Sequence, residues 1–153
     1  MPTPAKLVSA ILFAALAWWT GETIVREVLP DGSSVGRLRE VMAFMGLIIG
    51  WKVIGRATTG RMNRGTTVTV AITAGVAAAF VFLALGIVLH GFYEMIIRSL
   101  DSTYTEVGAA MNAMLGFIWD DVNLVANPVV LGTLFGGGAL VGLIGGIVGR
   151  NSH

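Results

Sequence analysis

Three side chains near the ends of apolar stretches could do chemistry: those of Glu22, His90 and Glu94. One imidazole and two carboxylates are suitable ligands for a divalent metal ion, and the same groups can relay protons in a membrane. His90 and Glu94 are four residues apart, so both lie on one face of a helix. One histidine and a few charges at helix ends are also common at membrane boundaries, and we favour this structural role.

Two acid–base pairs share one spacing. The motif ETIVR runs from Glu22 to Arg26, and the motif EMIIR runs from Glu94 to Arg98. In a helix, a glutamate four residues before an arginine faces it in the favourable order. We therefore expect two ion pairs, each at the outer boundary of a membrane.

Other chemistry finds little support in the sequence. The chain has no cysteine, which excludes thiolate metal sites, iron–sulfur clusters, disulfides and cysteine nucleophiles. The second histidine is the terminal His153, so two helix histidines of one chain cannot hold a haem, although a homodimer still could. No catalytic motif is present, and we assign the acids Asp120 and Asp121 to a solvated helix face. We expect a protein that is not an enzyme and has no cofactor.

The composition indicates which elements position these residues. Of 153 residues, 55% are hydrophobic and only 12% are charged, whereas soluble proteins carry about 25% charged residues. The net charge of +1 gives no reason to expect nucleic acid as a partner. We predict an all-α integral membrane protein, a four-helix bundle that forms a single transmembrane domain over 1–153. A spanning helix needs about 20 apolar residues, and the four spans are expected near residues 5–25, 38–55, 67–92 and 128–149.

The charges between the spans predict the orientation. Lys52, Arg56, Arg61 and Arg64 form a basic cluster with no acid among them, and such segments stay in the cytoplasm. Both termini are then cytoplasmic. Lys52 falls within the second span, where its long side chain can reach the headgroups. Ala15 and Ala17 have the spacing of a signal-peptide cleavage site, so the first span could be a signal peptide. We expect instead that it is retained as a membrane anchor.

An additional amphipathic helix is expected over residues 104–125, between the third and fourth spans. Apolar residues recur there every three or four positions, and polar residues mark the other side. The apolar positions are Val107, Met111, Met114, Ile118, Val122 and Val125, and the polar positions are Glu106, Asn112, Asp120 and Asn123. We expect this helix to lie in the outer interface or over the bundle. Its polar face is acidic, which favours a protein partner over anionic lipid.

Glycine recurs at intervals of four residues in the second and fourth spans. Gly138, Gly142 and Gly146 do so in the last span, and Gly46 and Gly50 do so in the second. This spacing lets another helix backbone approach closely. We expect these notches to pack the second and fourth spans together, with homo-oligomerisation as the alternative. A nucleotide-binding loop is excluded, because no strand precedes the glycines and no phosphate-binding lysine follows them.

The two halves of the chain resemble each other. Besides the two acid–base motifs, the sequence has VIGR at residues 53–56 and IVGR at residues 147–150, each at the end of a glycine-rich span. One interpretation is a tandem duplication of helical hairpins, 1–65 and 66–153. Another is chance, because inward spans commonly end in arginine.

These residues resemble the TrgA family of small bacterial membrane proteins, which are named for their association with tellurite resistance. The likeness lies in the start MPTPAKLVSAILFAALAW, in GWKVIGR followed by basic residues, in YEMIIRS with Tyr104 after it, and in the glycine-rich last span. It covers nearly the whole chain. The resemblance implies an inner-membrane helical protein linked to tolerance of metalloid oxyanions, without a defined enzymatic activity, and it assigns no functional residue.

Three functions follow as hypotheses. The first is a non-enzymatic inner-membrane protein that supports tellurite or other oxyanion resistance. The second is an accessory subunit of a larger respiratory or photosynthetic complex, with other membrane proteins or a second copy as partners besides the lipid bilayer. The third is a small oligomeric anion transporter with the basic cluster at its cytoplasmic mouth. We rank the transporter last, because no charged residue lies in the middle of a span.

Overall fold

The fold is that of a computed structural model, which describes residues 3–27, 37–59, 68–100 and 106–151. The described elements are all helical, in agreement with the predicted fold class. They are α1 (Pro4–Glu27), α2 (Leu38–Ile49), the π-helical segment η1 (Gly50–Ile54), α3 (Gly55–Thr59), α4 (Val68–Leu100), α5 (Val107–Val125) and α6 (Pro128–Asn151).

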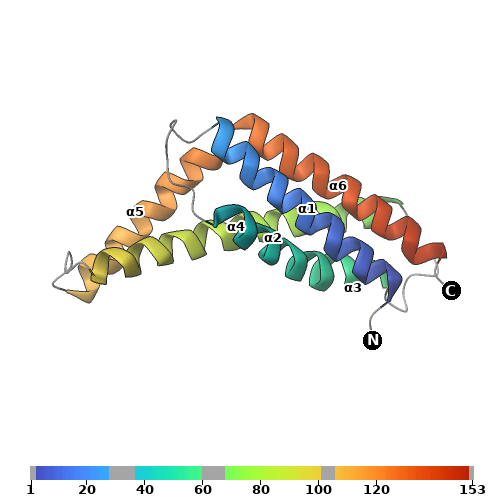
Figure 1. Ribbon diagram of the computed structural model, residues 1–153, viewed down its shortest axis with the longest axis horizontal. Helices are drawn as coiled ribbons and strands as arrows, with labels where there is room; N and C mark the ends of the chain where they lie inside the picture. The colour runs from blue at the N-terminus through green and yellow to red at the C-terminus, as the bar shows by residue number, and fades with distance from the viewer. Residues whose placement is uncertain (1–2, 28–36, 60–67, 101–105, 152–153) are drawn as a thin grey trace.

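Within this described part, four helices are long and apolar enough to cross a membrane, and they coincide with the four predicted spans. The second of them is continuous through α2, η1 and α3 and runs over Leu38–Thr58. Helices α1 and α4 run in one direction, and α2 and α6 run back, so Pro4 and Asn151 lie at the same end of the bundle (Figure 1). This up-and-down order suits four successive crossings.

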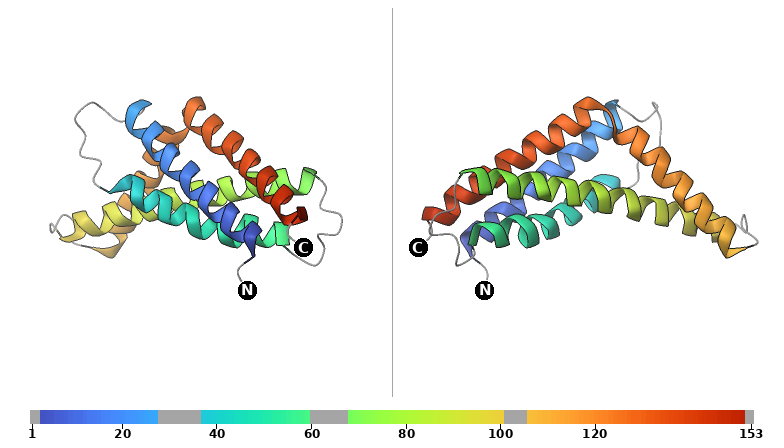
Figure 2. Two further views of the ribbon diagram at one scale, coloured as in Figure 1. Left: turned by 45° about the vertical axis from the view of Figure 1, so that its right-hand side comes forward. Right: turned by 180° about the vertical axis from the view of Figure 1, so that it is seen from behind.

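The third span is longer than its hydropathy predicts. Helix α4 has 33 residues, so at about 1.5 Å per residue it is roughly 50 Å long, whereas the hydrocarbon layer is about 30 Å thick. Its C-terminal part projects beyond the other long helices, and α5 runs back along it (Figure 2). We call residues 91–100 of α4 together with α5 the α4–α5 arm. The helix predicted after the third span is therefore present, while its place in the membrane interface stays a prediction.

The core of the bundle is built from small residues around two aromatic rings. Phe13 of α1 is fully buried, and its ring meets that of Phe82 of α4 edge to face, with centroids 5.9 Å apart and an interplanar angle of 81°. Ala17, Ala78 and Ala79 are also fully buried beside them. Alanine at these positions lets the helix backbones approach, and the rings fill the space that remains.

The predicted glycine notches are used in packing, but their partners differ from the prediction. A Cβ atom on Gly46 would lie 2.9 Å from the carbonyl oxygen of Phe13 in α1, and one on Gly138 would lie 2.8 Å from that of Gly75 in α4. The same pattern holds for the other notch positions, namely Gly50 against Ser9 and Ala10 of α1, and Gly142 and Gly146 against Ala71 of α4.

The expected packing of the second span on the fourth is therefore wrong. Helix α2 packs on α1, and α6 packs on α4, because α1 and α4 offer small residues opposite each notch. Gly75 of α4 lies opposite Gly138 and Gly142 of α6, and this role was not predicted from the sequence. The pairing of α1 with α2 and of α4 with α6 is the one that tandem hairpins would make, while superposition of the two halves stays a prediction.

Candidate functional site

The two carboxylates first considered for metal binding are each paired with arginine. Oε1 of Glu22 lies 2.6 Å from Nε of Arg26, and its Oε2 lies 2.7 Å from Nε of Arg39 at the start of α2. Glu94 pairs with Arg98 over 3.5 Å. Both expected pairs are thus present, and Arg39 is an unforeseen partner that ties α1 to α2. Across the described ranges, no three or more His, Cys, Asp or Glu side chains come together as a metal site would require.

His90 has a partner that the sequence did not suggest. Its Nδ1 lies 2.7 Å from Oδ2 of Asp121, a residue 31 positions further along the chain. The prediction that Asp121 lies on a solvated face is wrong, because only 17% of its side chain is exposed. Its neighbour Asp120 is exposed, as expected. The pair joins α4 to α5 and leaves the imidazole half exposed.

Close packing of α5 on α4 brings this pair together. A Cβ atom on Gly91 would lie 2.8 Å from Cγ1 of Ile118, so glycine next to His90 is what allows α5 to come near. Further out, the guanidinium of Arg98 lies 4.5 Å from the centre of the Phe117 ring, in a cation–π contact. The His90–Asp121 pair and the Arg98–Phe117 contact therefore hold α5 against α4 at two positions.

The predicted apolar face of α5 is divided between two environments. Ile118 and Val125 lie toward the rest of the protein, whereas Val107 and Met111 are exposed. Asp121 falls on the same stripe as Ile118 and Val125, at helical spacings of three and four. The position of Asp121 on an apolar stripe indicated that it is buried against a partner. This was missed because the adjacent Asp120 and Asp121 were assigned together to the polar face.

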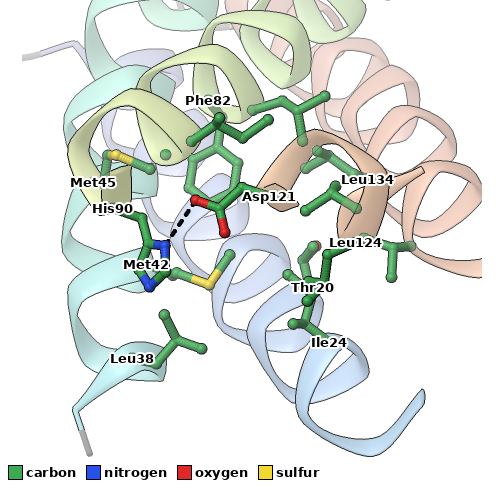
Figure 3. A pocket seen from close by; sticks show the side chains of 15 residues that line it. Thr20, Ile24, Leu38, Met42, Met45, Phe82, His90, Asp121, Leu124 and Leu134 are labelled. Atoms are coloured by element: carbon green, nitrogen blue, oxygen red, sulfur yellow. Dashed lines mark hydrogen bonds and ion pairs between the residues drawn. The ribbon is translucent and has the colours of Figure 1, made fainter. Parts of the chain in front are cut away.

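A cavity of about 170 Å³ lies beside the His90–Asp121 pair (Figure 3). It is formed where α1, α2, α4, α5 and α6 converge, and its lining is almost entirely apolar. The larger side chains around it include Met42, Met45, Phe82, Ile87, Leu124 and Leu134. The end of the bundle away from Pro4 and Asn151 thus contains a small, partly open hydrophobic space with one ionisable pair in its wall.

The polar side chains that line the cavity have hydrogen-bond partners within the protein. The hydroxyl of Thr20 donates to the carbonyl oxygen of Leu16 over 2.9 Å. His90 and Asp121 point toward one another, and the second ring nitrogen of His90 points away from Asp121 (Figure 3). When Nδ1–H donates to the carboxylate, Nε2 accepts a hydrogen bond in the neutral ring and donates one in the protonated ring. Nε2 is therefore the ring nitrogen of His90 that can hydrogen-bond a ligand beside the cavity.

The basic cluster is only partly within the described residues. Lys52 lies in η1 and Arg56 in α3, and both are exposed. Arg61 and Arg64 lie outside the described residues, as does Tyr104. The π-helical segment around Lys52 was not predicted; such segments frequently occur at functional sites.

Comparisons of the chain with protein-family models, with curated proteins and with solved structures find no match. The geometry of the chain itself therefore carries the functional argument.

Proposed function

We propose that the chain is a non-enzymatic integral protein of the bacterial inner membrane, with both termini in the cytoplasm, that works by binding a ligand in the cavity beside His90 and Asp121. The cavity is the observation that carries this proposal. An apolar hollow with one or two oriented polar groups is the usual form of a small-molecule site. The His90–Asp121 pair provides those groups where five helices meet.

The resemblance to the TrgA family supports a cellular role for this binding. Proteins of that family are associated with tellurite resistance, so we propose that the chain contributes to tolerance of tellurite and related oxyanions. Binding in the membrane would act on tolerance indirectly, through membrane energetics, without any reaction of the oxyanion at the cavity.

A cavity-filling variant tests both parts of the proposal. A Cβ atom on Gly86 would meet only Cε of Met45, at 3.5 Å, so Gly86→Leu places its side chain in the cavity without a backbone clash. Gly136→Leu is the matched control, because nothing lies within 4 Å of its Cβ. In a deletion strain we expect the wild-type chain and Gly136→Leu to restore tellurite tolerance, and Gly86→Leu to fail at equal membrane abundance. Unchanged tellurite sensitivity of the deletion strain, or full restoration by Gly86→Leu, would contradict the proposal.

The α4–α5 arm favours a second candidate function, that of an accessory subunit. With Val68 at the inner boundary, the part of α4 beyond His90 extends past a hydrocarbon layer of about 30 Å. Large apolar side chains remain exposed there, with Leu100 at 76% and Val107 at 79%. Apolar surface outside the hydrocarbon layer is stabilised when another protein covers it.

Co-purification tests the accessory role. We expect the wild-type chain, purified in mild detergent, to elute with one or more membrane proteins in a fixed ratio. Trp119→Asp on the arm should release them, because its side chain is 66% exposed and an acid there would not pack against an apolar partner. The control is Phe80→Ala on the bundle part of α4, where the side chain is 64% exposed and alanine places no charge in the hydrocarbon layer. Elution of the wild-type chain alone would contradict this role.

A further inference from the structure

We propose that the cavity binds the ring of a membrane quinone or quinol of the single-ring class. This inference rests on the proposed binding function of the cavity and names its ligand. Three features carry it: the size of the cavity, its depth along α4, and the hydrogen-bonding state of His90.

The size of the cavity suits one substituted ring. Its volume is about 170 Å³, and an apolar protein cavity of about 150 Å³ binds benzene. A macrocycle is too large for this space, and a sugar headgroup would leave hydroxyl groups without partners against its apolar lining. Met42, Met45 and Phe82 line the cavity, and thioether and aromatic groups make favourable contacts with ring faces and edges.

The depth of the cavity suits an amphiphile with an apolar tail. His90 lies 22 residues after Val68 in α4, which is roughly 33 Å along the helix at 1.5 Å per residue. With Val68 at the inner boundary, the cavity lies near the outer edge of a hydrocarbon layer of about 30 Å. The imidazole is 50% exposed, so the site is open on that side. A prenyl tail can then extend from the ring into the bilayer.

The charge at the site favours a neutral ligand. Asp121 holds Nδ1 of His90 at 2.7 Å, and Glu94 lies one helical turn further along the same stripe of α4. A lipid phosphate would add an anion beside Asp121, and Arg98 is already paired with Glu94 over 3.5 Å, so like-charge repulsion disfavours this ligand. An acyl chain offers Nε2 no hydrogen-bond partner and so makes no use of the His90 imidazole.

A ring oxygen satisfies Nε2 in both forms of the ligand. A quinol hydroxyl donates to Nε2 of the neutral imidazole, and a quinone carbonyl accepts from Nε2–H of the protonated imidazole. Asp121 fixes the ring orientation in both cases, because a carboxylate on one ring nitrogen sets the role of the other. His90 is thus the residue that distinguishes an oxygen-bearing ring from a hydrocarbon of equal size.

The direct test is equilibrium binding of decylubiquinone, a short-tailed benzoquinone, to the purified full chain in mild detergent. Decylbenzene, which has the tail and ring without oxygens, is the matched probe. We expect the wild-type chain to bind decylbenzene about tenfold more weakly, which is the effect of one hydrogen bond worth about 1.4 kcal/mol. Equal affinity for the two probes would overturn the proposal.

Variants assign the binding to the cavity. His90→Phe keeps an aromatic ring and removes the hydrogen bond, so we expect it to lower the affinity for decylubiquinone about tenfold and to leave that for decylbenzene unchanged. Tyr93→Phe is the control on the same helix, because the Tyr93 side chain is 58% exposed and does not line the cavity. Gly86→Leu should abolish binding of both probes. If His90→Phe does not fold, the two-probe comparison on the wild-type chain and the Gly86→Leu result decide the matter.

The binding and tolerance experiments together distinguish a wrong ligand assignment from a wrong cellular role. If decylubiquinone does not bind but Gly86→Leu still fails to restore tellurite tolerance, the cavity is functional and the quinone assignment is wrong. If Gly86→Leu restores tolerance while decylubiquinone binds as described, the ligand assignment holds and the proposed role in tolerance is wrong.

Discussion

Replacing Gly142 with leucine is expected to prevent α6 from packing on α4 and to remove most of the folded protein. A Cβ atom at this position would overlap the carbonyl oxygen of Ala71 and lie 3.0 Å from Cα of Gly75. Both are backbone atoms, so no rotation of a side chain can relieve the overlap. Overpacking costs about 1–3 kcal/mol when a core can adjust, and here a whole helix must move. We therefore expect a loss at or above about 3 kcal/mol.

The measurement is the fraction of protein that elutes as a single species in mild detergent, together with its thermal unfolding temperature. Gly136→Leu is the control on the same helix, because nothing lies within 4 Å of its Cβ. It should elute and unfold as the wild-type chain does. If Gly142→Leu behaves like Gly136→Leu, the close approach of α4 and α6 is not required for folding.

Truncating Phe13 to alanine is expected to lower the free energy of unfolding by about 3 kcal/mol. Its side chain is fully buried and meets the ring of Phe82 at a centroid distance of 5.9 Å. The value is at the low end for a buried phenylalanine, because the unfolded chain stays in lipid and the change loses mainly packing. Neighbouring residues on three helices surround the space, so lipid cannot fill it easily.

Unfolding in mixed detergent micelles measures this loss. Phe80→Ala on α4 is the matched control, because the side chain of Phe80 is 64% exposed, and its effect should stay within about 0.5 kcal/mol. A Phe13→Ala variant as stable as Phe80→Ala would mean that the two rings do not form the centre of the core.

Local sequence features were enough to predict the helices. Each span is a contiguous run of apolar residues, and the helix after the third span was visible from its periodicity. The apolar span was placed at residues 67–92, and the predicted Glu94–Arg98 pair required the helix to continue beyond it; α4 ends at Leu100. Its last turns contain Glu94 and Arg98, and these charges lower the hydropathy while leaving helix formation unaffected. The Glu22–Arg26 and Glu94–Arg98 pairs were predictable because both partners lie on one helix.

The candidate site was predictable only in part. His90 was singled out, but it was grouped with Glu22 and Glu94, which pair with arginines instead. Its actual partner, Asp121, comes from a different helix, and the cavity beside them is formed by five helices. The stripe on α5 indicates that Asp121 is buried, but no pattern within one helix identifies its partner on another.

The sequence by itself determined that the chain forms four apolar helices and one helix of mixed character, because helix formation and lipid solubility depend on residues that are close along the chain. The tertiary structure alone decided that α2 packs on α1, that α6 packs on α4, and that Asp121 meets His90. These contacts require close approach at glycines, to the backbone of Gly138 at Gly75 and to the Ile118 side chain at Gly91. Such a fit depends on the shapes of both surfaces at once, so neither helix encodes it alone.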